Sequence, residues 1–185
     1  NDGVIDKKCL AVNAPSSVAA EASLLSATFP DEHLFLAPGD NVAVDLLTGV
    51  FERRHLSYVI IDGSGGNLKQ FAGSEKGYVG VDASAGDKAA ISAALKHFRE
   101  HRPFFTYIYL HDCKKALQSL DEKGYYNTVT GFDNCLGEFV AELQKEDIYY
   151  TSLLIVTSAA SSSPSNFVPL VINGPMCKNN SKISG

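Results

Sequence analysis

The sequence has no long hydrophobic run, no basic stripe and no closely spaced cysteine pair, and each absence excludes a class of protein. No apolar stretch approaches the roughly 18 residues that a membrane helix requires, so we expect no membrane span. The formal net charge is −5 and the 16 lysines and arginines are scattered, which predicts no nucleic-acid partner. The four cysteines lack the C-x-x-C spacing of zinc and redox sites.

The sequence does contain enough apolar material for a folded core. Its 185 residues are 45% hydrophobic and 10% aromatic, which excludes disordered and collagen-like chains. This length fits one domain, because most domains hold roughly 100–200 residues. We therefore expect a single domain over residues 1–177 and a polar tail over residues 178–185.

Short β-branched and aromatic runs bounded by turn residues predict five strands. These runs are Ser57–Ile61, Tyr78–Val81, Phe104–Leu110, Ser152–Thr157 and Val168–Ile172. Most are continuously apolar, as in parallel strands that helices cover on both faces.

Four helices are predicted from apolar residues at helical spacing behind a residue that can cap the helix. The caps are Ser16 or Ser17 for residues 18–26, Asp40 or Asn41 for a segment through Phe51, Asp87 for the helix with Ile91 and Phe98, and Asp133 or Asn134 for the helix with Phe139. The alternation of strands and helices predicts an α/β fold, a three-layer α/β/α sandwich with a mostly parallel sheet.

Three strand ends carry polar residues that could form a site, because ligands of open α/β sheets gather at the C-terminal ends of the strands. They are Asp62-Gly63-Ser64-Gly65-Gly66, His111-Asp112-Cys113 and Ser158–Ser163. The glycine segment could wrap an anion. However, Leu68 stands where a dinucleotide fingerprint needs glycine, and the P-loop Gly-Lys-Ser/Thr is absent. A plain turn is the favoured interpretation.

His111 and Asp112 are the candidate metal ligands. In an extended segment their adjacent side chains would point to opposite sides, so only one of them could bind a given ion. A nucleophilic serine needs a base within reach and a group that orients the base, and the sequence reveals no such triad. Ser64 and Ser161 stay open as nucleophiles, with His111 as a base or ligand.

Five segments between about residue 10 and residue 176 follow one another in a recognisable order. They are Pro15–His33, Pro103–Asp112, Phe132–Phe139, Leu153–Ser158 and Val168–Pro175. In this order they resemble the C-terminal two-thirds of the alkaline phosphatase superfamily, which includes sulfatases, nucleotide phosphodiesterases and phosphoethanolamine transferases. The resemblance implies an alkaline-phosphatase-like sandwich. It also implies a family that hydrolyses or transfers phosphate and sulfate esters with a Thr, Ser or modified Cys nucleophile beside metal ions.

The departures from this family pattern fall on its catalytic positions. After Ser158 the family carries Asp-His-Gly, which supplies two metal ligands, whereas this chain carries Ala159-Ala160-Ser161. Asp112 matches a metal-binding acid, but Ala116 stands where a histidine is expected. The family's first strand, with another metal-binding acid and the nucleophile, would precede this chain. Phosphoryl transfer at a metal needs several converging ligands, so the resemblance implies a relative that lost them.

The leading hypothesis is a catalytically degenerate alkaline-phosphatase-like domain, a pseudoenzyme without a cofactor, in a binding or accessory role. Its binding crevice would contain Asp62, Gly63, Ser64, Gly65, Asp112 and Ser161, and its partner would be a small anionic ligand or a protein. Two alternatives stay open. One is a divalent-metal-dependent hydrolase or transferase of phosphate or sulfate esters with an atypical site. The other is an unrelated α/β module that binds an anion or nucleotide over residues 63–66.

The expected location is periplasmic or extracellular. The family is often exported, and a chain that begins with Asn1 rather than Met has been processed or excised. An even number of cysteines permits disulfides, and a bond between Cys113 and Cys135 would brace the loop between two predicted elements. Four free thiols would instead indicate a cytosolic protein.

Overall fold

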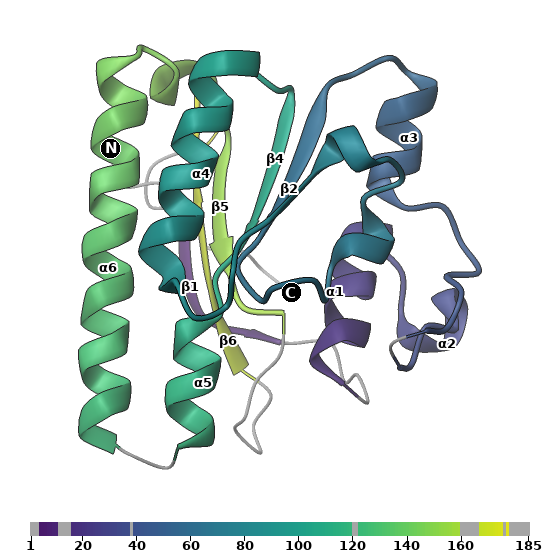
Figure 1. The fold of residues 1–185 in the computed structure, drawn as a ribbon, viewed down its shortest axis with the longest axis horizontal. Coiled ribbons are helices and arrows are strands. Elements are labelled where there is room, and N and C mark those ends of the chain that lie inside the picture. The colour runs from purple at the N-terminus through teal and green to yellow at the C-terminus, as the bar shows by residue number, and fades with distance from the viewer. Residues whose placement is uncertain are drawn as a thin grey trace. The chain divides into compact units, whose positions relative to one another are not determined.

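The computed structural model describes residues 4–10, 16–37, 39–119, 122–159, 167–175 and 177. In these residues six α-helices and six β-strands form a mixed α/β structure, in agreement with the predicted class (Figure 1). The helices are α1 (Ser17–Ser26), α2 (Pro30–His33), α3 (Leu47–Arg53), α4 (Gly86–His101), α5 (Asp112–Gln118) and α6 (Glu122–Lys145). The strands are β1 (Val4–Leu10), β2 (Tyr58–Asp62), β3 (Tyr78–Gly80), β4 (Phe105–Tyr109), β5 (Leu154–Thr157) and β6 (Phe167–Asn173).

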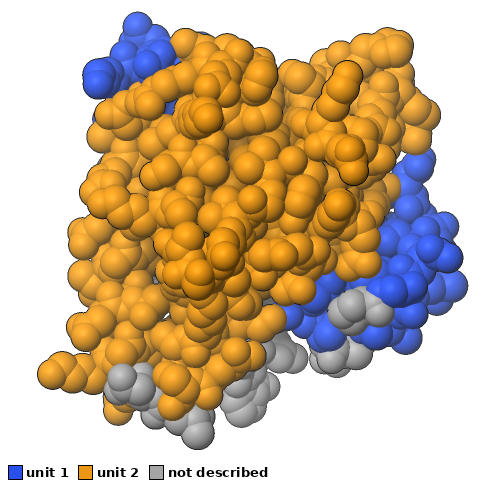
Figure 2. Space-filling view, viewed as in Figure 1, with its two compact units in different colours: residues 1–45, 143–185 blue, residues 46–142 orange. Residues whose placement is uncertain are grey.

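The chain divides into two compact units, which Figure 2 colours separately. The first unit combines residues 1–45 with residues 143–185, and the second consists of residues 46–142. The predicted polar tail, residues 178–185, lies outside the described residues.

The second unit contains a parallel sheet in the order β3-β2-β4. Every residue of the central strand β2 is buried, and helix α4 packs against β2 and β4 (Figure 1). The predicted parallel, continuously apolar strand over Ser57–Ile61 is thus confirmed with a shift of one residue. Because parallel strands end at the same edge of a sheet, the residues that follow β2, β3 and β4 gather there.

The first unit contains an antiparallel sheet in the order β1-β6-β5. The prediction of a mostly parallel sheet is wrong for these strands. A parallel pair needs a crossover of roughly a dozen residues or more, and only residues 158–166 connect β5 to β6. Strand β1 was not predicted, because the charged residues Asp6, Lys7 and Lys8 interrupt its apolar pattern.

The first unit also buries a histidine in its core. The Nε2 of His33 lies 2.8 Å from the Oγ of Ser23, and its Nδ1 accepts a hydrogen bond from the Phe35 N–H at 3.0 Å. The Ser23 hydroxyl lies 3.2 Å from the Ala19 carbonyl oxygen, to which it donates. We assign the neutral tautomer with its proton on Nε2, since only that form satisfies all three bonds. Burial lowers the pKa of His33, which keeps the ring neutral.

Two of the helix starts show how capping decides a boundary. Ser16 caps α1 as predicted, because its side chain accepts a hydrogen bond from the Ala19 N–H at 3.1 Å. The predicted cap at Asp40 or Asn41 is wrong, since α3 begins only at Leu47. The Asp40 carboxylate instead accepts the Leu36 N–H at 3.0 Å and closes the preceding turn.

Helix α6 begins at Glu122, so the prediction that Asp133 or Asn134 caps it is also wrong. Both residues lie in the interior of the helix and are exposed. Buried and half-buried residues at helical spacing form one continuous face from the first turn, and this face overrides the low helix propensity of the glycines within it. These residues are Tyr125, Thr128, Phe132, Leu136 and Phe139.

Candidate functional site

Two of the three predicted site segments meet at the C-terminal edge of the parallel sheet. Asp62 ends β2, and His111 and Asp112 follow β4. The loop after β3 is tied to the same edge, because the Val81 N–H donates to the Asp62 carbonyl at 2.9 Å. This edge is therefore the candidate site of the second unit.

Asp62 is fully buried and its carboxylate accepts four hydrogen bonds. Its Oδ1 accepts from the N–H and the hydroxyl of Ser64, and its Oδ2 accepts from the Leu68 N–H at 2.8 Å and the Tyr78 hydroxyl at 3.0 Å. Burial, helped by the bond to Asp62, raises the pKa of the Tyr78 hydroxyl and keeps it a donor. The backbone N–H groups of Ser64, within the glycine segment, and of Leu68, just after it, thus bind a carboxylate of the same chain. This arrangement supports the plain turn over an anion site.

The remaining contacts of the glycine segment also belong to a turn. The Gly63 N–H donates to the Tyr109 carbonyl at 3.0 Å, and a Cβ on Gly63 would lie 2.7 Å from that oxygen. Glycine is therefore required here by the close approach of β4. The Ser64 hydroxyl accepts the Asn67 N–H at 3.2 Å and donates to Asp62, and no histidine of the described residues forms a hydrogen bond with it.

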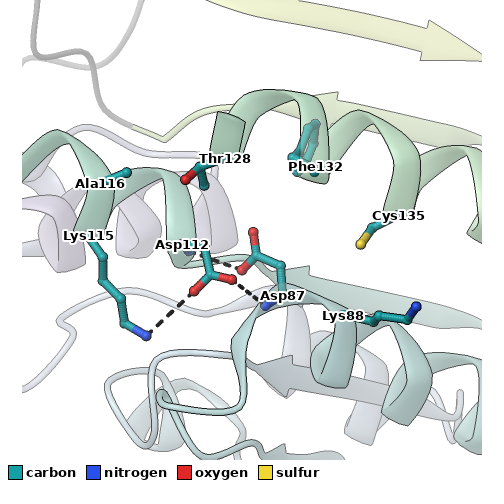
Figure 3. Close-up of a pocket in the computed structure, with 9 residues that line it drawn as sticks. Asp87, Lys88, Asp112, Lys115, Ala116, Thr128, Phe132 and Cys135 are labelled. Carbon is teal, nitrogen blue, oxygen red and sulfur yellow. Dashed lines mark hydrogen bonds and ion pairs between the residues drawn. The ribbon is translucent and has the colours of Figure 1, made fainter. Parts of the chain in front are cut away.

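Asp87 and Asp112 cap each other's helices (Figure 3). The Oδ2 of Asp112 accepts the Asp87 N–H in the first turn of α4 at 2.7 Å. The Oδ1 of Asp87 accepts the N–H groups of His111 at 2.7 Å and of Asp112 at 3.1 Å, where α5 begins. The prediction that Asp87 caps its own helix is wrong, because α4 begins at Gly86 and Asp87 serves α5 instead. Burial raises the pKa of Asp87, although these N–H groups oppose the rise.

The second oxygen of Asp112 faces a cation of the chain itself. The Oδ1 lies 3.5 Å from the Nζ of Lys115, which also donates to the Ala83 carbonyl. A metal ion at Asp112 would have to compete with this ammonium and with the cap on α4. In the described residues no group of three or more His, Cys, Asp and Glu side chains is arranged to hold a metal ion.

His111 stands at the cap position of α5 with a helical backbone, not in the extended segment that the sequence suggested. Its Nδ1 is buried and has no hydrogen-bond partner in the described structure. Burial lowers the pKa of the ring, and Lys114 and Lys115 add to this effect. The ring is therefore held neutral, which is the state of a base, but no hydrogen bond joins it to Ser64 in the described residues.

A pocket of about 550 Å³ opens beside the Asp87–Asp112 pair. It lies between the first turns of α4 and α5 and one face of α6, all in the second unit (Figure 3). Its lining combines charged and apolar side chains: Asp87, Lys88, Asp112, Lys115, Ala116, Thr128, Gly131, Phe132 and Cys135. Of these, the sequence had singled out Asp112 alone as a site residue. The helical spacing of the apolar residues of α6 was the signal that could have identified further lining residues, such as Thr128 and Phe132.

Most of the third predicted segment, Ser158–Ser163, lies outside the described residues. Ser161 and Ala160 lie outside the described residues, whereas Ser158 and Ala159 follow β5 in the first unit. Ala159 is half-buried and its methyl side chain has no ligand atom. Cys113, Cys135 and Cys177 carry free thiols, so the Cys113–Cys135 disulfide is not formed in the structure.

No protein-family model matches the sequence, and no curated protein is significantly similar to it. Among the helices of the described chain, none combines the length and the apolar character needed to cross a membrane.

Proposed function

We propose that this chain is a catalytically degenerate domain of the alkaline phosphatase type, with a binding or accessory role. The proposal rests on the order of its segments and on the mixed α/β structure with a parallel β3-β2-β4 sheet. It includes the finer architecture of a three-layer sandwich and, on the family resemblance alone, a periplasmic or extracellular location.

One observation supports the proposed loss of catalytic activity. Asp112, which matches a metal-binding acid of the family, uses its Oδ2 to cap α4 through the Asp87 N–H and its Oδ1 to pair with Lys115. Phosphate and sulfate esters react at sites where metal ions neutralise developing negative charge. Here the charge of the acid is already balanced by an ammonium and an amide of the same chain. Ala159, at the position of another family ligand, adds no donor atom.

The test is ester hydrolysis by the full chain. We expect no turnover of p-nitrophenyl phosphate or p-nitrophenyl sulfate above buffer with added Zn²⁺, Mn²⁺, Mg²⁺ or Ca²⁺. Turnover that disappears in Asp112→Ala would establish the metal-dependent alternative instead. Counting thiols under denaturing, non-reducing conditions tests the location, since four titratable thiols would contradict an exported protein.

A further inference from the structure

The pocket between α4, α5 and α6 contains a carboxylate oxygen to which no described residue donates a hydrogen bond. Asp87 is only 5% exposed, and its Oδ1 accepts two N–H groups. Its Oδ2 accepts no hydrogen bond from the described residues, and Asp87 forms no ion pair with them. Figure 3 shows this oxygen directed toward the α6 side of the pocket. Asp87 Oδ2 is not among the fully buried polar atoms without a partner, so it is accessible from the pocket, where solvent or a ligand can supply its donor.

The charges around the pocket indicate what kind of donor fits. Asp112 is compensated by Lys115 at 3.5 Å, which leaves the charge of Asp87 as the unbalanced one. The Thr128 hydroxyl donates to the Gly124 carbonyl at 2.9 Å, so its oxygen keeps lone pairs for a second donor from a ligand. An ammonium group supplies several donors and a positive charge at once. A divalent metal is a poorer fit, because no third ligand of the usual types converges here in the described chain.

The rest of the lining selects further groups of a ligand. Lys88 follows Asp87 on α4, and its ammonium group makes no hydrogen bond or ion pair with the described residues, although its carbonyl accepts the Ser92 hydroxyl at 2.8 Å. Phe132 and Ala116 provide apolar surface in the same lining. The volume of about 550 Å³ lies within the range of small-molecule sites, roughly 300–1,000 Å³.

We propose that this pocket binds a small zwitterion, whose ammonium group lies on Asp87 Oδ2, whose acidic group pairs with Lys88 and whose aliphatic part contacts Phe132. The proposal specifies the binding role proposed above, and the two can fail separately. Hydrolysis of an ester by the chain would contradict the proposed binding role, whereas failure of the zwitterion to bind would contradict only the assignment of the ligand.

The test is titration of the ¹⁵N-labelled full chain with 5-aminopentanoate, followed by amide chemical shifts. We expect shifts centred on the first turns of α4 and α5 and on the Thr128–Cys135 face. Pentanoate lacks the ammonium and should produce none, and pentylamine lacks the acid and should bind several-fold more weakly. Equal shifts with pentanoate, equal affinity for pentylamine, or no shifts with 5-aminopentanoate would overturn the proposal.

Two variants distinguish a loss of binding in the pocket from a general loss of stability. Asp87→Asn keeps an oxygen for the N–H groups of α5 and replaces the acceptor at Oδ2, so we expect affinity to fall by about tenfold or more. Gly131→Leu places a side chain where a Cβ meets no atom within 4 Å, and should block binding without a change of charge. Asp82→Asn, on the exposed loop before α4, is the control and should bind like the wild type. Unchanged affinity in Asp87→Asn would contradict the assignment.

Discussion

Asp112 and Asp87 lie 25 positions apart in the sequence and exchange hydrogen bonds across two helix starts. The Asp112 carboxylate accepts the Asp87 N–H at 2.7 Å, and the Asp87 carboxylate accepts the Asp112 N–H at 3.1 Å. Helix starts carry N–H groups without intrahelical acceptors, and a carboxylate satisfies both their hydrogen bonds and their partial positive charge. This exchange fixes α4 against α5 and engages the acid that the family resemblance assigns to a metal.

Removal of the Asp112 carboxylate should destabilise the fold. We expect Asp112→Ala to lower the free energy of unfolding by about 1–2 kcal/mol, because the α4 amide loses its cap and Lys115 loses its partner. Asp112→Asn keeps an acceptor oxygen and should cost less. Urea denaturation followed by far-UV circular dichroism measures both. Asp133→Ala, at an exposed site inside α6, is the control, and a loss in Asp112→Ala no larger than in this control would refute the capping role.

The buried carboxylate of Asp62 should matter more than any other acid at the sheet edge. Asp62→Ala leaves the Leu68 N–H and the Tyr78 hydroxyl without their acceptor, which should cost about 3–5 kcal/mol. Asp82 accepts from Ser84 in a similar turn but is exposed, so Asp82→Ala should have a much smaller effect. Equal losses of Tm in the two variants would show that burial of Asp62 is not decisive.

Two glycines should respond to alanine in opposite directions. Gly86 has a φ of +77°, and a Cβ there would lie 2.8 Å from the Oδ2 of Asp112, so Gly86→Ala should destabilise by about 1–2 kcal/mol or more. Gly131 lies inside α6 with open space around it, and Gly131→Ala should stabilise by about 0.5–1 kcal/mol. Chemical denaturation of the pair checks the signs. A stabilising Gly86→Ala would mean that the start of α4 is placed wrongly.

Stability should depend on pH through His33. Its pKa is lowered in the folded state by burial, whereas the unfolded chain titrates near about 6.5. Between these two values the unfolded state binds more protons, so the free energy of unfolding falls as pH decreases through this window. His97 and His111 have pKa values lowered by burial as well, so part of this dependence should persist without His33.

The variant His33→Gln isolates that contribution. Unfolding curves between pH 7.5 and 5.5 should show a shallower decline in the variant than in the wild type. Parallel declines would indicate that the bonds of His33 to Ser23 and Phe35 do not keep the ring neutral.

The sequence was most informative where one local signal determined the structure. The continuous apolar run after Ser57 gave β2 to within one residue, and Ser16 gave the start of α1, because burial on both faces and capping leave direct marks in the sequence. The start of α6 was misplaced, since Asp133 and Asn134 look like caps while the decisive feature is a face that extends back to Tyr125.

The site was less predictable because its contacts are distant in sequence. Asp87 was assigned to its own helix, and only the fold shows that its carboxylate belongs to α5. The pocket combines the first turn of α4 with Thr128 and Phe132 of α6. Which side of α6 faces α4 is decided by the packing of the two helices, and the sequence does not show it. Asp62 was recognised as a strand-end residue, but its four donors come from a turn and from Tyr78 on the next strand.

The most direct test of the central claim is the metal content of the full chain, purified without chelators, together with its Tm after addition of Zn²⁺, Mn²⁺, Mg²⁺ or Ca²⁺. A domain whose Asp112 is a helix cap paired with Lys115 should contain no stoichiometric metal and show no change in Tm. One or more equivalents of a divalent ion, with a raised Tm that Asp112→Asn abolishes, would contradict the account, because binding to the folded state alone raises the melting temperature.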